Sequence, residues 1–188
     1  MKFMLATKEN MTEYFTEEGT VIPVTILSAG PVTVKRIFSA EKDGYNSVQV
    51  GFVIKKNKIL REFRLKPNDK IEVKEGTSVD VSVFTPGDLL QISSVSKGKG
   101  FQGVVKRHGF AGGPRTHGQK HSEREAGSIG GGLRTHVPRG MRMPGRMGSE
   151  RITQKNLKVV SVDKENNIML VKGAIAGKRG SLVEIISR

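Results

Sequence analysis

The sequence contains no cysteine and no tryptophan. Without cysteine the chain forms no disulfide and offers no thiolate to a metal, so a disulfide-stapled fold and a thiolate zinc site are both excluded. Long apolar runs are also lacking. None approaches the roughly 20 residues that a membrane helix needs, and the run at 3–6 is too short for a signal peptide. These absences permit a reducing compartment, and we expect a soluble cytoplasmic protein.

Acidic residues are scarce as well. The chain has 18 of them against 32 Lys plus Arg, which gives a net charge of +14. A balance this basic favours a polyanionic partner, usually nucleic acid and less often an anionic membrane. The alternative is a soluble enzyme that is merely alkaline. The distribution of charge along the chain distinguishes these classes.

The basic charge is concentrated in a central segment, residues 96–151. This segment holds 14 of the 23 glycines, all four histidines, and 12 Lys or Arg against three acids. The apolar residues of its stretch 127–148 follow neither a helical nor a strand period. Burial cannot offset a backbone entropy of ~1–2 kcal/mol per ordered residue. We therefore expect the segment to be mobile alone and to be ordered by nucleic acid, whose phosphates arginine binds with paired N–H groups.

The flanking segments predict β-strands. They are short, rich in Val, Ile and Phe, and separated by Gly, Pro, Asn and Asp. The stretch 78–84 alternates three valines with Asp80 and Ser82, which is the period of a half-buried strand. No long helix is indicated, so the pattern favours a small antiparallel barrel or sandwich built from 1–95 and 152–188, with 96–151 as an insertion. The expected strands are 21–29, 32–38, 47–54, 59–65, 78–84, 89–95, 157–162, 168–175 and 181–187.

Two glycine-rich motifs resemble nucleotide-binding loops but lack their context. Residues 98–105, GKGFQGVV, match a dinucleotide or kinase glycine loop. The first needs a following helix in a βαβ unit and the second needs further catalytic motifs, and neither is present. Residues 173–180, GAIAGKRG, lack the spacing of a P-loop. We interpret the first as a basic turn, and the second as either a phosphate-contacting or a solvated turn.

The four histidines raise the alternative of a metal site. His117 and His121 would share one face of a helix, but Gly118 lies between them and argues against that helix. The nearby acids are Glu123 and Glu125 only. Paired carboxylates and a Ser–His–acid arrangement are not evident either. We expect no metal, no other cofactor and no catalytic residue.

Four separated stretches carry a family resemblance. They are SKGKGFQGVVKRHGFAGGPRTHG (96–118), GSIGG (127–131), GMRMPGRMGSERIT (140–153) and LVKGAIAGKRGSLVEI (170–185). In this order they closely resemble the bacterial type of universal large-subunit ribosomal protein three, and 17–34 and 41–52 look like its N-terminal part.

The resemblance implies a mainly β protein: a Greek-key β-barrel of the translation-protein type with a long, largely irregular Gly- and Arg-rich central finger. It also implies a structural protein of the ribosome that catalyses nothing and binds early in subunit assembly. The finger would run into large-subunit (23S-type) rRNA toward the peptidyl transferase region. The implied partners are this rRNA and neighbouring large-subunit ribosomal proteins, with no membrane and no small-molecule substrate.

The chain departs from the family pattern in two places. Where the family has a Gly-Lys-Lys-Ile-Gly-Met-Thr run, residues 6–12 read ATKENMT, so the RNA contacts of that run do not carry over. After Gly-Ser-Ile-Gly the family often has a Thr-Pro-Gly run, whereas 131–138 read GGLRTHVP. No glutamine lies between Gln119 and Gln154, so we do not expect the glutamine methylation of some members. We expect the finger tip around 133–141 to follow its own path.

We predict that the basic side chains of the central segment, with those of the 173–180 turn, contact ribosomal RNA. The candidate residues are Lys97, Lys99, Lys106, Arg107, His108, Arg115, His117, Lys120, Arg124, Arg134, His136, Arg139, Arg142, Arg146, Arg151, Lys178 and Arg179.

Two other classes stay open. A non-ribosomal RNA chaperone or assembly factor shares the basic segment but predicts exchangeable, substoichiometric association. A small barrel enzyme predicts a pocket with shifted titratable groups and an activity that survives deletion of 112–148.

Overall fold

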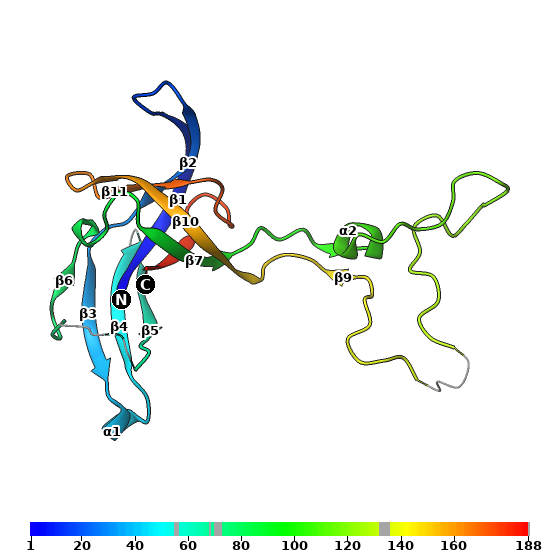
Figure 1. The fold of residues 1–188 in the computed structure, drawn as a ribbon. Helices are drawn as coiled ribbons and strands as arrows, with labels where there is room; N and C mark the ends of the chain where they lie inside the picture. The colour runs from blue at the N-terminus through cyan, green and yellow to red at the C-terminus, as the bar shows by residue number, and fades with distance from the viewer. Residues whose placement is uncertain (55–56, 68, 70–72, 132–135, 188) are drawn as a thin grey trace. The chain divides into compact units, whose positions relative to one another are not determined.

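The computed structural model describes residues 1–54, 57–67, 69, 73–131 and 136–187. The chain divides into two compact units. One unit, here called the barrel unit, comprises Met1–Ser96 and Arg151–Arg188. The other, here called the extension, is Lys97–Glu150 (Figure 1).

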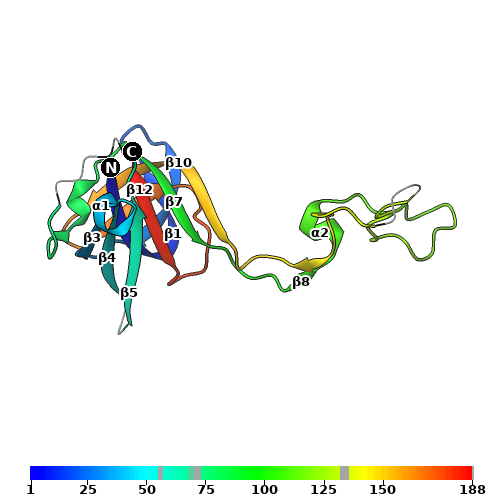
Figure 2. The same ribbon diagram turned by 90° about the horizontal axis from the view of Figure 1, so that it is seen from below.

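Six antiparallel strands close a barrel in the order β1-β12-β7-β10-β11-β2. Strands from before and after the extension are interleaved in it. Strand β12 lies between β1 and β7 (Figure 2), and β10 lies between β7 and β11. The barrel therefore needs both flanks of the chain. The strands are β1 (Lys2–Phe15), β2 (Val21–Ser28), β7 (Leu89–Val95), β10 (Arg151–Asp163), β11 (Ile168–Lys172) and β12 (Leu182–Ser187).

A second, four-stranded antiparallel sheet completes the barrel unit. Its order is β5-β4-β3-β6, and the one-turn helix α1 (Ala40–Asp43) connects β3 to β4. The prediction of a mainly β protein is confirmed. Within the described residues, no helix is long and apolar enough to cross a membrane. The strands are β3 (Val32–Phe38), β4 (Ser47–Ile54), β5 (Asn57–Arg64) and β6 (Ser78–Val79).

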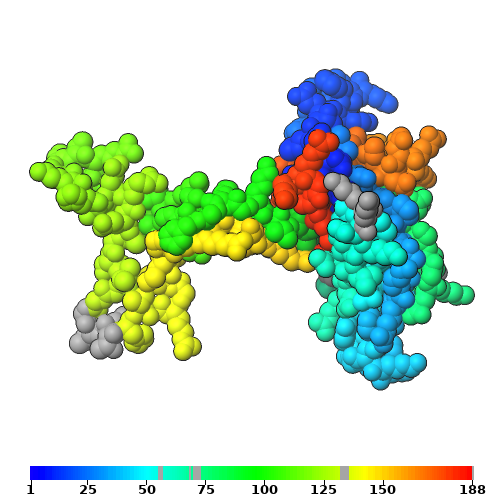
Figure 3. All heavy atoms as spheres, turned by 180° about the vertical axis from the view of Figure 1, so that it is seen from behind, coloured from blue at the N-terminus to red at the C-terminus, as the bar shows by residue number. Residues whose placement is uncertain are grey.

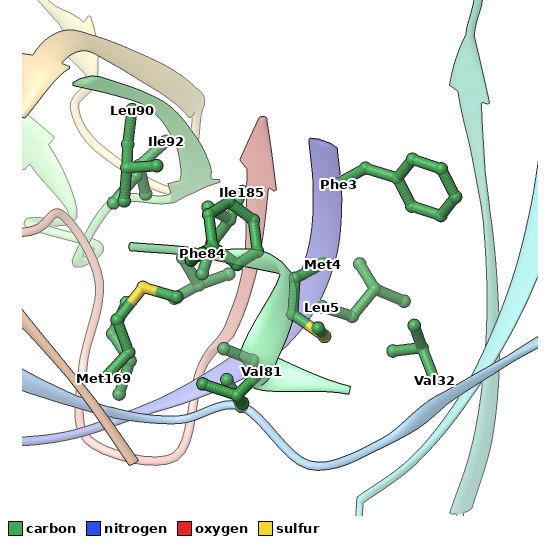
Figure 4. Close-up of a cluster of buried hydrophobic side chains, with 14 of the residues drawn as sticks. Phe3, Met4, Leu5, Val32, Val81, Phe84, Leu90, Ile92, Met169 and Ile185 are labelled. Atoms are coloured by element: carbon green, nitrogen blue, oxygen red, sulfur yellow. The ribbon is translucent and has the colours of Figure 1, made fainter. Parts of the chain in front are cut away.

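One hydrophobic cluster joins the barrel to the second sheet (Figure 4). The ring of Phe3 in β1 stacks on that of Phe63 in β5, with 5.0 Å between the ring centroids. Leu90 of β7, Met169 of β11 and Ile185 of β12 are fully buried in the same cluster. Each such side chain contributes about 1.5–3 kcal/mol when it leaves water. The core thus combines residues from before and after the extension.

All nine expected strands overlap an observed one, but the strand expected at 78–84 is wrong beyond Val79. The side chain of Asp80 accepts a hydrogen bond of 2.7 Å from the N–H of Val81. It thereby caps the 3₁₀ helix η1 (Val81–Val83), which leaves Val81 buried and Val83 exposed. Aspartate favours such local bonds over a strand ladder, and alternating valines did not reveal this. The long strand β1 was not expected at all.

Candidate nucleic-acid interface

The extension has almost no core of its own. Among its described residues, 97–131 and 136–150, Val104 is the only buried one. Burial of one valine contributes about 1.5–3 kcal/mol, against a backbone entropy of ~1–2 kcal/mol for each ordered residue. The path of the extension therefore depends on local hydrogen bonds rather than on a hydrophobic core.

Two short antiparallel stretches form the base of the extension. Strand β8 (Phe101–Gln102) pairs with β9 (Gly145–Arg146). The pairing continues past the strands, because the N–H of Lys99 donates to the carbonyl oxygen of Met147 at 2.9 Å, and the N–H of Met147 donates to that of Gly100 at 2.9 Å. These bonds hold the two ends of the extension together.

Two glycines permit close backbone approach within the extension. A Cβ at Gly148 would lie 2.1 Å from the carbonyl oxygen of Lys97, and a Cβ at Gly112 would lie 2.1 Å from that of Glu123. Both glycines also have positive φ, 76° and 74° respectively. Only glycine fits either position without displacing backbone.

A one-turn helix places three basic side chains together. The helix α2 (Val104–His108) ends at Gly109, which has φ 72° and donates its N–H back to the last turn. Arg107 Nη1 donates a hydrogen bond to the carbonyl oxygen of Met143 at 2.7 Å. His108 Nε2 lies 3.1 Å from the same oxygen. Because a carbonyl oxygen can only accept a hydrogen bond, Nε2 is the donor in this contact. Two predicted RNA contacts thus also have a structural role, since they tie α2 to the returning chain.

Beyond α2, residues near Gly113 and Glu123 hold two parts of the chain together. The N–H of Gly113 donates to the carbonyl oxygen of Glu123 at 3.0 Å, and Arg115 forms an ion pair with the Glu123 carboxylate. The hollow beside this contact has a volume of about 450 Å³, and its one charged lining side chain is Glu125. A hollow with no basic lining residue is a poor phosphate site.

Most of the predicted contacts lie on the surface of the extension with their charge uncompensated. Eight lysines and arginines are exposed and form no ion pair within the described part of the chain. His117 and His136 are also exposed, and Arg134 lies outside the described residues. The eight are Lys97, Lys99, Lys106, Lys120, Arg124, Arg139, Arg142 and Arg146.

Three predicted contacts belong to the barrel unit, and two of these are ion-paired. Arg151 binds the Glu184 carboxylate through both terminal nitrogens, and Arg61 Nε lies 3.2 Å from the same carboxylate. Arg179 Nε lies 3.4 Å from Glu9 Oε2. The third, Lys178, is exposed. The barrel unit therefore partly neutralises its own candidates, whereas most of those in the extension remain uncompensated.

The 173–180 turn has a fixed conformation. Lys8 Nζ donates to the carbonyl oxygens of Ile175 at 2.6 Å and Gly177 at 3.2 Å. The amide of Gln154 holds the same turn, since its Oε1 accepts from the N–H of Ala176 at 2.9 Å. Lys8 lies in the 6–12 stretch that otherwise departs from the family pattern, at a position where the pattern also has Lys, and here it supports a turn from within β1.

Two further basic residues were not among the sequence candidates. Lys155 and Lys158 are exposed on β10, the strand that begins at Arg151. The signal was present in the sequence, because residues 151–158 contain three basic residues and no acid. Within the described residues, no group of three or more His, Asp or Glu side chains is arranged to hold a metal ion.

The comparisons with known proteins all indicate the same family. A family model described as ribosomal protein L3 matches residues 68–168. The chain is 44% identical to a protein of Acetivibrio thermocellus named large ribosomal subunit protein uL3, over 98% of this chain and 95% of that protein. It is 42% identical to the protein of that name from Carboxydothermus hydrogenoformans, over 98% of this chain and 96% of that protein. It is 43% identical to the protein of that name from Herpetosiphon aurantiacus, over 97% of this chain and 94% of that protein.

Proposed function

The chain belongs to the ribosomal protein L3 family, the bacterial uL3 type, and on that premise we propose that its extension binds large-subunit ribosomal RNA of the 23S type. The relatives are named as proteins of the large ribosomal subunit. The family is structural and not enzymatic. Its members are constituents of a particle made largely of RNA, and this chain has the same role.

The observation that carries the proposal is the set of eight exposed cations on a segment whose described part has one buried residue. Phosphates supply the charge that these side chains lack inside the protein, and contacts to RNA replace the missing core. Arginine can fork two N–H groups onto one phosphate or stack on a base. Most of the recognition would follow RNA shape, because contacts to phosphate carry little sequence information.

The proposal extends to the arrangement of the protein in the subunit. The segment 96–151 acts as an RNA-binding finger that reaches toward the peptidyl transferase region, and 1–95 with 152–188 form a Greek-key barrel of the translation-protein type. The protein joins the cytoplasmic ribosome early in assembly and contacts neighbouring ribosomal proteins. Two features support this: a closed barrel contributed by both flanks, and a basic inserted unit.

The proposal is tested by the salt dependence of binding between the full chain and large-subunit rRNA. Each neutralised phosphate adds ~0.7–0.9 to the slope of log affinity against log salt. Arg142→Gln should lower the slope by about one such step, whereas Arg142→Lys, which keeps the charge, should leave it nearly unchanged. A flat salt response of the unmodified chain contradicts RNA binding through phosphates.

The alternative is an assembly factor with the same basic segment. Sedimentation of the large subunit distinguishes it from a structural constituent. A structural constituent stays with the large subunit, in one copy, through a high-salt wash. A factor that exchanges is lost in that wash and is present in fewer copies than subunits.

A further inference from the structure

The hairpin of β1 and β2 extends beyond the barrel. β1 pairs with β12 only through residues 2–7, and β2 pairs with β11 only through residues 24–28. Farther out, the described strands pair only with each other, as far as Phe15 opposite Val21. The dark-blue projection in Figures 1 and 3 is this end of the hairpin. We call residues 9–25 the acidic hairpin.

The strand register collects exposed apolar side chains on one face of the acidic hairpin. Residues directly opposite each other in an antiparallel pair share a face. Phe15 lies opposite Val21. Met11, four residues from Phe15 and on the same face, lies opposite Thr25. Phe15 is 66% exposed, and Met11 and Val21 are each 48% exposed. Apolar side chains gathered in this way mark interaction surfaces more often than single exposed residues do.

The charge of the hairpin is opposite to that of the chain. Residues 9–34 contain four glutamates and no lysine or arginine, in a protein of net charge +14. Glu13 lies opposite Pro23 on the apolar face, between Met11 and Phe15. Glu13, Glu17 and Glu18 form no ion pair within the described part of the chain, and only Glu9 is paired, with Arg179.

These two properties identify the kind of partner. Carboxylates are repelled by the phosphates that surround a ribosomal protein, so this face is unsuited to rRNA. An apolar face with uncompensated carboxylates fits a protein segment that presents apolar side chains together with Lys or Arg. A second copy of this chain, a membrane and RNA are the competing occupants.

We propose that the acidic hairpin docks a basic, partly apolar segment of a neighbouring protein in the large subunit. The proposal rests on the ribosomal placement in Proposed function and adds to it a surface that meets protein rather than RNA. Phe15 and Val21 supply the apolar contact, and Glu13 supplies the charge that selects a basic partner.

Photo-crosslinking inside assembled subunits tests the proposal. A benzoylphenylalanine probe replaces Phe15 in the full chain, and a second chain carries the probe at Phe101, an exposed phenylalanine of the extension. We expect the probe at Phe15 to attach to a peptide of another protein that contains Lys or Arg, and the probe at Phe101 to attach to rRNA.

The two probes separate the two proposals. A probe at Phe15 that attaches to rRNA, to a second copy of this chain or to nothing overturns the hairpin inference, whatever the probe at Phe101 does. A probe at Phe101 that fails to attach to rRNA counts against RNA binding by the extension and leaves the hairpin result to be judged separately.

A charge reversal sharpens the test. With the probe kept at Phe15, Glu13→Lys should lower the yield of the protein crosslink roughly tenfold, the scale of losing one good interface contact. Glu165→Lys, at an exposed turn of the barrel unit, is the matched control and should leave the yield unchanged. Equal yields for the two variants overturn the role of Glu13.

Discussion

Arg107 Nη1 lies 2.7 Å from the carbonyl oxygen of Met143, a hydrogen bond between residues 36 positions apart in the extension. The guanidinium also packs against Gly145, where a Cβ would lie 2.6 Å from the same nitrogen. A basic side chain therefore acts here as a structural link before any RNA is bound. Its replacement should loosen the extension even in the free protein.

We expect Arg107→Ala to speed amide exchange at Met147, whose N–H bonds to the carbonyl oxygen of Gly100. A hydrogen bond from a charged donor contributes about 1.5–3 kcal/mol, so exchange should rise about tenfold or more. Hydrogen exchange with residue-level resolution on the full chain measures this. Arg146→Ala is the control, because Arg146 is exposed, and equal effects of the two variants would contradict the structural role of Arg107.

The free protein should exchange unevenly along the extension. Between residues 112 and 144, described backbone hydrogen bonds are few, and they include Gly113 to Glu123 and Met141 to Pro138. We expect fast exchange over 112–144 in the free protein, slower exchange at Lys99 and Met147, and protection of the whole segment in the subunit. Slow exchange of 112–144 in the free state would refute the claim that RNA orders it.

Gly148 and Gly140 form a matched pair for testing close approach. Both have positive φ, 76° and 78° respectively, so either alanine variant bears a strain of roughly 1–2 kcal/mol. Only Gly148 faces a backbone oxygen at 2.1 Å, whereas nothing lies within 4 Å of a Cβ at Gly140. Gly148→Ala should therefore open the base of the extension and impair incorporation into the subunit, and Gly140→Ala should do so much less. Protease cleavage near 97–102 and subunit occupancy are the measurements.

The barrel unit should lose stability in acid through Asp88. Its carboxylate accepts a hydrogen bond from Lys2 Nζ at 2.7 Å and another from the N–H of Thr85 at 3.0 Å. Above all the Lys2 bond, and then the Thr85 bond, lower the pKa of Asp88 below its ordinary value. The resulting stabilisation is complete above the unfolded pKa of about 3.9 and disappears as the pH falls through the lower folded pKa.

We expect Asp88→Asn to reduce the free energy of unfolding by about 1 kcal/mol at pH 7 and by much less at pH 2. Denaturant unfolding of the barrel unit in the full chain, followed at both pH values, gives the comparison. Glu165→Gln removes an exposed carboxylate and should change neither value. A loss that is equal at pH 7 and pH 2 would show that the effect does not come from the charge of Asp88.

Strands β4 and β7 were revealed by the sequence because most of their residues are buried or half-buried, so they appear as short apolar stretches. β1 does not, because residues 3–6 are buried and the residues beyond lie in the exposed hairpin. Its composition changes midway with its surroundings, and no single period describes it. The strand expected at 78–84 is wrong beyond Val79 for a different reason. There the local hydrogen bond from the N–H of Val81 to the Asp80 side chain sets the backbone conformation.

The sequence located the basic segment but could not tell which charges remain uncompensated. The ion pairs of Arg151 with Glu184 and Arg179 with Glu9 join residues 33 and 170 positions apart. They depend on strand order, which composition does not contain. Candidates in the extension were easier to judge, because residues 97–150 contain 11 Lys or Arg and only three acids. With so few partners available, most of its cations stay free of ion pairs.

The position of β12 sets an order of events during synthesis. This strand separates β1 from β7, and Lys2 pairs with Ser187. A protein leaves the ribosome from its N-terminus onward, so the barrel cannot close until residue 187 has emerged, long after residues 97–150. For that interval the nascent chain presents a cationic, glycine-rich loop on an unfinished scaffold. The cell must then shield the loop from stray nucleic acid, or let the intended RNA capture it before the scaffold is complete.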